Sequence, residues 1–84
     1  MVTIMTVSSV ELAKNLKLAR AKRYPKDRVS DFAMRCEIGL STYKKMEKGD
    51  LSVGMLQYFK VAEVLKLESG FEQLFQLEDD WFNE

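Results

Sequence analysis

The chain has 84 residues, of which 46% are hydrophobic and 31% charged, and its 13 basic residues balance its 13 acidic ones. This composition excludes a disordered chain and a membrane-embedded one, and the length predicts one small domain. Because there is no histidine and only one cysteine, Cys36, we expect no metal site, no cofactor and no enzymatic activity.

The start of the chain predicts a short arm and then a long helix. Residues 1–8 are expected to form an extended N-terminal arm, without the basic start and long apolar run of a signal peptide. Ser8 and Glu11 fit a capping box that opens the first helix. Apolar residues then recur at helical spacing as far as Arg23, and Pro25 disfavours helix at the residue before it.

Two short helices separated by a tight turn are predicted next. The first should span Val29–Cys36 and the second Leu40–Lys48, with residues 37–39 as the turn. Gly49 suits the left-handed position that often follows a helix.

Two further helices complete the predicted domain at residues 9–76. Ser52 is the expected N-cap of a helix that reaches Leu65, and Ser69 with Glu72 makes a second capping box for a short fifth helix. Residues 77–84 form an acidic tail with two large aromatics. The sequence thus predicts a compact all-α domain of five helices. Its expected core comprises Leu12, Leu16, Ala19, Phe32, Ala33, Cys36, Ile38, Tyr43, Met46, Met55, Phe59, Ala62, Leu65, Leu67, Phe71 and Leu74.

Four features carry a resemblance to a known family: the Phe-Ala pair at 32–33, the run STYKKMEKG at 41–49, the helix expected after Ser52, and the step from Ala62 to Leu65. Together they resemble the Xre/Cro family of lambda-repressor-like DNA-binding domains. The resemblance implies that the helices after residues 29 and 40 form a helix-turn-helix. It also implies a dimeric, sequence-specific transcriptional repressor that reads a palindromic operator with the second of these helices in the major groove.

Two positions in this region differ from the family pattern. Glu37 stands where the family has glycine in the turn, so we expect the turn to shift and Gly39 to take the left-handed geometry. Val29 replaces a glutamine that often holds a phosphate, and the preceding loop is about two residues longer than usual.

The resemblance assigns candidate DNA contacts to the second helix of the pair and to the start of the first. Lysine and serine can bond base edges, and leucine can pack on a thymine methyl. The expected base-reading residues are Leu40, Ser41 and Lys45; the expected backbone contacts are Arg28, Val29, Ser30, Thr42, Lys44 and Lys48. Arg20 and Glu47 should form a structural ion pair. Lys22, Arg23 and Lys26 either extend the phosphate contacts or are ordinary surface charge.

The end of the chain is the expected dimer surface, through Phe71, Phe75, Trp81 and Phe82, because aromatic anchors are favoured at interfaces. Two alternatives stay open: Trp81 and Phe82 fold back onto their own domain, or the N-terminal arm pairs with its copy across the two-fold axis.

Charge is divided unevenly along the chain. Residues 1–48 carry 11 Lys and Arg against 5 Asp and Glu, a net charge of +6, and residues 49–84 carry 2 against 8, a net charge of −6. This division favours a basic face for double-stranded DNA over a merely dipolar protein.

Two questions of function stay open at the level of sequence. The stretch from Lys48 to Leu74 is similar to small antitoxins that repress their own operon and bind a HipA-type kinase toxin, which would make a toxin protein a second partner. A stand-alone or prophage regulator is the other reading within the family, and a protein–protein interaction module without DNA binding is the alternative outside it. We expect a cytoplasmic location and no membrane association.

Overall fold

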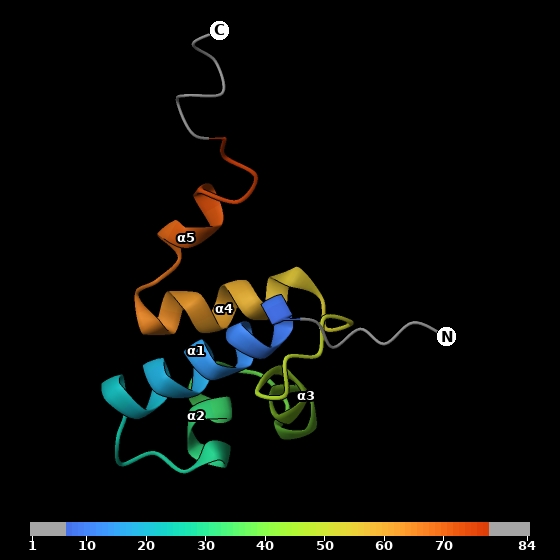
Figure 1. The fold of residues 1–84 in the computed structure, drawn as a ribbon. Coiled ribbons are helices and arrows are strands. Elements are labelled where there is room, and N and C mark those ends of the chain that lie inside the picture. Colours follow the sequence, from blue (N-terminus) through green and yellow to red (C-terminus); the bar gives the residue numbers. More distant parts are fainter. Residues whose placement is uncertain (1–6, 78–84) are drawn as a thin grey trace, which may run out of the picture.

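The computed structural model describes residues 7–77, which form helices and connecting turns without a strand (Figure 1). The predicted all-α class is therefore confirmed for this part of the chain. Residues 1–6 and 78–84, and with them most of the expected arm and tail, lie outside the described residues. The helices are α1 (Val7–Arg23), α2 (Val29–Arg35), α3 (Leu40–Met46), α4 (Met55–Leu65) and α5 (Ser69–Glu72).

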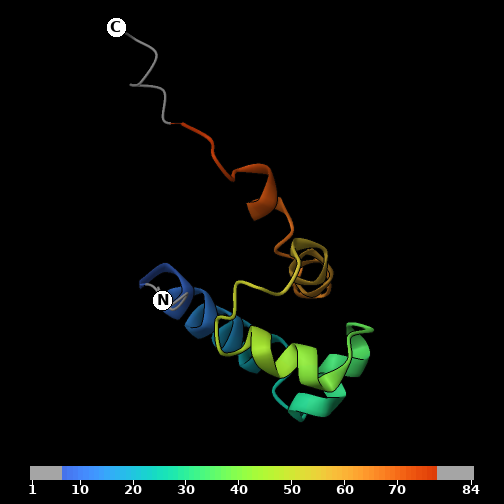
Figure 2. The same cartoon turned by 90° about the vertical axis from the view of Figure 1, so that its right-hand side faces the viewer.

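Helix α1 lies at the centre of the arrangement. Helix α4 packs along it on one side, while α2 and α3 pack against each other on the other side (Figures 1 and 2). Helix α5 projects from the far side of α4, away from α2 and α3 (Figure 2). Within residues 7–77, no helix is both long enough and apolar enough to cross a bilayer.

The core is built mainly from α2 and α3. Phe32, Tyr43 and Met46 are completely buried, and the rings of Phe32 and Tyr43 meet edge to face with centroids 5.4 Å apart. Edge-to-face contact suits the charge distribution of aromatic rings. Leu16 from α1 and Leu65 from α4 join this core, so the central helices share one apolar cluster.

On the α4–α5 side the predicted core is confirmed at Leu65 but wrong at three positions. Met55 is 59% exposed, and Leu67 and Leu74 are each 46% exposed. Val61, which was not predicted, is 2% exposed and fills the inner face of α4 instead. This side carries more apolar residues than the core can enclose, so hydrophobic character alone did not identify the inner ones. The remaining predicted residues outside the buried set, Leu12, Ala19, Phe59, Ala62 and Phe71, are half-buried.

The predicted N-caps are also wrong. Helix α1 begins at Val7 and so includes Ser8, α4 is capped by Gly54, and α5 is capped by Glu68. Ser52 is instead held in the preceding turn, where its amide and hydroxyl both donate to Asp50 Oδ1, at 2.8 and 2.6 Å. Serine competes for such local bonds as readily as it caps helices, which explains the difference.

In the turn between α2 and α3, the non-glycine residue Glu37 adopts the left-handed backbone conformation that glycine usually takes. Glu37 has φ 59°, whereas Gly39 has φ −58° and caps α3, so the expected shift of the turn to Gly39 is wrong. The Ile38 amide donates to the Ala33 carbonyl at 3.0 Å, a bond across the end of α2 that holds Glu37 in the left-handed region.

Helix α3 ends at Met46, two residues earlier than predicted, and the expected left-handed glycine is confirmed at Gly49, with φ 78°. A Cβ atom at Gly49 would collide with the backbone carbonyl oxygen of Ser9 in α1. Only glycine therefore permits the close approach of this turn to the first helix.

Candidate nucleic-acid interface

Helix α3 has one buried face and one exposed face. Tyr43 and Met46 point into the core and are fully buried. Ser41, Lys44 and Lys45 are exposed on the helix. Leu40 is 40% exposed at its first position, Lys48 is exposed just after its end, and Thr42 is half-buried. The residues predicted to read bases therefore share one accessible helix, with ammonium, hydroxyl and apolar groups side by side.

An ion pair fixes α3 to α1. Arg20 Nε donates to Glu47 Oε2 at 2.6 Å, and Arg20 Nη2 donates to Glu47 Oε1 at 3.5 Å, so the expected pair is present. The Tyr43 hydroxyl donates to the same carboxylate at 2.5 Å. The bond to Glu47 raises the pKa of Arg20 above its ordinary value, and burial raises the pKa of Tyr43. These three side chains hold the end of α3 in a fixed position.

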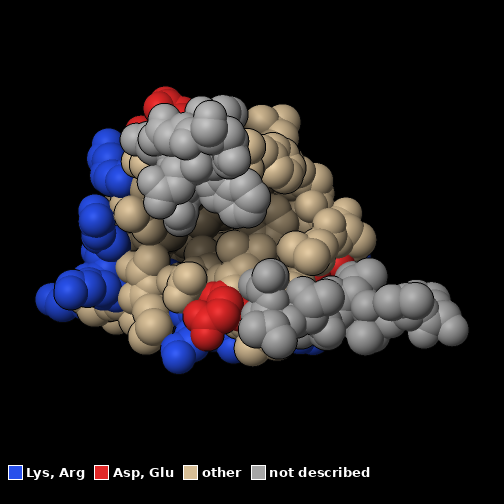
Figure 3. Space-filling model, turned by 45° about the horizontal axis from the view of Figure 1, so that its top comes forward, with Lys and Arg blue, Asp and Glu red and all other residues tan. Residues whose placement is uncertain are grey.

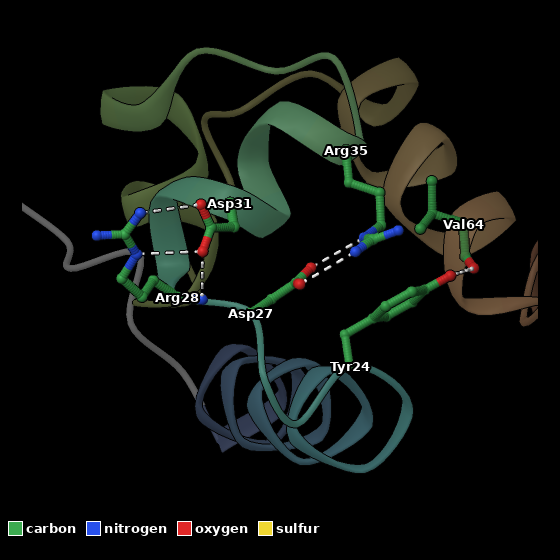
Figure 4. Close-up of polar contacts among 6 residues, drawn as sticks. All are labelled: Tyr24, Asp27, Arg28, Asp31, Arg35 and Val64. Atoms are coloured by element: carbon green, nitrogen blue, oxygen red, sulfur yellow. Dashed lines mark hydrogen bonds and ion pairs between the residues drawn. The ribbon is translucent and has the colours of Figure 1, made fainter.

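Arg28 caps the start of α2 and pairs with Asp31 (Figure 4). Its Nε and its backbone amide both donate to Asp31 Oδ2, at 3.1 and 3.0 Å. The bond from the Arg28 side chain lowers the pKa of Asp31. Although the Arg28 side chain is 82% exposed, its charge is compensated, so a phosphate would compete with Asp31 for it.

The other predicted backbone contacts on α2 are less accessible. Val29 packs against the core cluster, and Ser30 is half-buried. The structure therefore places the exposed predicted residues mostly on and just after α3, with Arg28 at the edge. The lysines and arginine whose role was open, Lys22, Arg23 and Lys26, are all exposed at the end of α1 and in the loop after it.

A second polar cluster was not predicted from the sequence. Arg35 Nε and Nη2 donate to the two carboxylate oxygens of Asp27, at 2.9 and 3.0 Å, and the guanidinium lies 4.2 Å from the centre of the Tyr24 ring (Figure 4). The Tyr24 hydroxyl donates to the Val64 carbonyl at 3.4 Å. This cluster ties the loop after α1 to α2 and α4. No spacing rule marks such a pair, because Asp27 lies in an irregular loop.

A shallow hollow between α2 and α3 adds two residues that sequence reasoning missed. Met34 is 77% exposed and lines this hollow together with Glu37 and Leu40. Met34 extends the apolar contact offered by Leu40. The exposed carboxylate of Glu37 opposes phosphate and so restricts which part of this surface can approach a DNA backbone.

The predicted dimer residues fall into three groups. Phe71 is half-buried and meets Phe59 edge to face with centroids 5.4 Å apart. Phe75 is 95% exposed. Trp81 and Phe82 lie outside the described residues.

The single thiol has no place in a reactive site. Cys36 is 3% exposed, and burial raises its pKa to about 11. Among the described residues there is no cluster of three or more His, Cys, Asp or Glu side chains that could hold a metal ion. Comparison of the chain with protein-family models, curated proteins and solved structures found no match.

Proposed function

We propose that this protein binds double-stranded DNA through α3 and acts as a dimeric, sequence-specific transcriptional repressor. In this proposal α2 and α3 are a helix-turn-helix, with α3 in the major groove and α2 across the backbone. The observation that carries it is the division of α3 into two faces. Ser41, Lys44 and Lys45 are exposed, while Tyr43 and Met46 are fully buried behind them.

The chemistry of the exposed face supports base reading. Lys45 can donate to guanine O6 and N7, Ser41 can donate or accept, and Leu40 can pack on a thymine methyl. Because the Arg20–Glu47–Tyr43 contacts hold the end of α3, these groups are presented in a fixed orientation. Lys44 and Lys48, whose ammonium groups have no ion pair within the described residues, are suited to phosphates.

Selection of bound duplexes from a random DNA pool tests the proposal. We expect enrichment of a palindrome whose half-sites are separated by about one helical turn, about 34 Å. Binding to the selected duplex should weaken steeply with salt, with log K falling by about 0.9 per phosphate contacted for each tenfold rise in salt. A pool that remains random would contradict the proposal and leave a protein–protein interaction module as the alternative.

Two lysine substitutions separate base reading from backbone contact. Lys45→Ala should cost about 1–3 kcal/mol on the selected site and relax the preference at one position. Lys44→Ala should weaken binding to all sequences alike and lower the salt slope by about one. Lys66→Ala is the matched control, because this exposed lysine ends α4, which α1 separates from α3. Equal weakening by Lys45→Ala on every sequence would refute its role as a base reader.

A further inference from the structure

An apolar groove opens between α1, α4 and α5. It has a volume of about 540 Å³, within the range of binding pockets in proteins. Leu12 and Leu16 from α1, Met55 and Ala62 from α4, and Phe71 and Leu74 from the α5 region are among its walls. In Figure 3 the visible floor of the hollow is formed by side chains without charge, and most Lys and Arg side chains lie along one side of the molecule, away from it.

The groove offers almost nothing to a polar ligand. None of the residues that line it is charged. The hydroxyl of Tyr58 is already used, because it donates to the Asp50 carbonyl at 2.7 Å, and the Asn15 amide is the other polar side chain of the lining. An occupant of this groove must therefore be apolar.

The groove is too exposed to be only the inner surface of a complete core. Met55, Leu51 and Leu74 all line it and are 59%, 50% and 46% exposed. A continuous apolar surface of this kind on a small domain marks a site of interaction.

The same chain carries a projecting apolar side chain beside this groove. Phe75 follows Leu74 directly and is 95% exposed, in a left-handed backbone conformation with φ 65°. A bulky residue adopts this conformation rarely. Leu74 faces the groove, whereas Phe75 does not line it. Phe75 therefore leaves the groove of its own chain unfilled and is free to contact a groove in another molecule.

We propose that two copies of this chain dimerise by reciprocal insertion, with Phe75 of each copy in the apolar groove of the other. A projecting group and a complementary hollow on one molecule generate a closed pair when a two-fold axis relates the copies. The volume of the groove accommodates the Phe75 ring, and Leu77, 53% exposed two residues later, adds apolar surface at the same contact. This inference rests on the dimeric form of the proposed function and names the surface that forms it.

Sedimentation of the full chain without DNA tests the contact. Phe75→Lys removes the inserting ring, and Met55→Glu places a charge in the groove. Both positions are exposed in the single chain, and Glu at the first residue of a helix suits the helix dipole, so both variants should keep their helical circular dichroism. Each should raise the dimer dissociation constant at least about 100-fold, because two insertions are lost per dimer. Leu56→Glu is the control, since Leu56 is the next residue on α4, is 66% exposed and does not line the groove.

Mixing the two defective variants gives the sharper test. In a mixed pair, the Met55→Glu chain keeps Phe75, which enters the intact groove of the Phe75→Lys chain. At the second contact, the lysine of the Phe75→Lys chain meets the glutamate in the groove of the Met55→Glu chain. We expect a heterodimer where neither variant dimerises alone. An interface in which the two Phe75 rings meet each other, without the groove, would not be restored by mixing and would overturn the proposal.

Other results are equally decisive. The wild-type chain could stay monomeric, and its groove could bind an apolar fluorescent probe only after residues 78–84 are removed. These two results together would assign the groove to the chain's own tail and overturn the proposal. A dimer unaffected by Phe75→Lys would also overturn it. Because the assay contains no DNA, loss of the proposed DNA binding would leave this result unchanged, and a dimer that forms through another surface would refute this contact without refuting the proposed function.

Discussion

The two sides of α1 differ in how they treat apolar side chains. On the side of α2 and α3, which we call the closed side, the large side chains Phe32, Tyr43 and Met46 have no exposed surface, although Met34 on the outside of α2 is 77% exposed. On the side of α4 and α5, the open side, Met55 is 59% and Phe75 95% exposed. The closed side completes its core from one chain. The open side leaves large apolar side chains exposed, and in our proposal a second copy of the chain covers them.

Polar groups follow the same division. On the closed side, the Glu47 carboxylate accepts bonds from both Arg20 and Tyr43. Two buried side-chain oxygens lack a hydrogen-bond partner within the described residues, Gln57 Oε1 and Glu68 Oε1, and both lie on the open side. Buried polar groups are normally paired, so the open side is also less complete in its polar contacts.

Phenylalanine truncation should give the largest difference between the sides. Phe32→Ala should lower the free energy of unfolding by about 3–5 kcal/mol, because it leaves a cavity in a fully buried site. Phe75→Ala, measured at concentrations where the chain is monomeric, should change it by less than about 0.5 kcal/mol. Urea denaturation followed by circular dichroism measures both. Similar losses for the two variants would remove the distinction between the sides.

Removal of the Glu47 carboxylate should give the next largest effect. Glu47→Gln keeps the size of the side chain but leaves the Arg20 guanidinium, only 17% exposed, without its counter-charge. We expect a loss of about 1.5–3 kcal/mol in urea denaturation. Glu63→Gln is the control, because Glu63 is exposed on α4 and should tolerate the change. A loss no greater than that of the control would show that the ion pair does not hold α3 in place.

Two glycine substitutions sharpen the comparison. Gly49→Ala should cost more than about 1 kcal/mol, because its φ is 78° and a Cβ atom would strike the Ser9 carbonyl oxygen. Gly70→Ala should instead be neutral or stabilising by up to about 1 kcal/mol, since its position in α5 is open space and alanine favours helix. Thermal unfolding distinguishes the opposite signs. A harmless Gly49→Ala would mean that the turn does not pack closely on α1.

The smallest expected effect is on the stability of the protein in acid, and it concerns the turn between α3 and α4 that contains Asp50 and Ser52. The bond from the Ser52 hydroxyl lowers the pKa of Asp50 below its ordinary 3.8. The ionised carboxylate therefore stabilises the fold above that pH, and the contribution is lost as the pH falls through the lowered pKa. Asp50→Asn and Ser52→Ala should each make stability less dependent on pH below about 3.8. An unchanged acid profile in both would contradict this assignment.

Sequence reasoning worked best where periodicity and burial agree. The starts of α2 and α3 and the burial of Phe32, Tyr43 and Met46 were predicted, because a helix with one apolar stripe has one possible inner face, whereas α2 ends at Arg35, one residue before the predicted end. The open side could not be predicted in the same way. Helix α4 carries apolar residues on several faces, and nothing in the pattern distinguishes the buried Val61 from the exposed Met55.

For the candidate DNA contacts, only the exposure of the side chains can be compared with the prediction. Ser41, Lys44 and Lys45 are exposed as expected, because their neighbours Tyr43 and Met46 determine which way α3 faces. The pairing of Arg28 with Asp31 and the cluster of Arg35, Asp27 and Tyr24 were not predicted. These contacts depend on where the loop after α1 places its side chains, which no periodicity encodes.

Because of its position, Cys36 can be used to detect local opening of the fold without introducing a label site. It is the only thiol in the sequence, lies 3% exposed at the end of α2 and has its pKa raised to about 11, so a thiol reagent at neutral pH meets neither an accessible nor an ionised sulfur. The rate at which a thiol reagent labels Cys36 therefore reports how often α2 separates from the rest of the core. DNA bound across α2 and α3 would slow that rate, which gives a readout of occupancy from the unaltered protein.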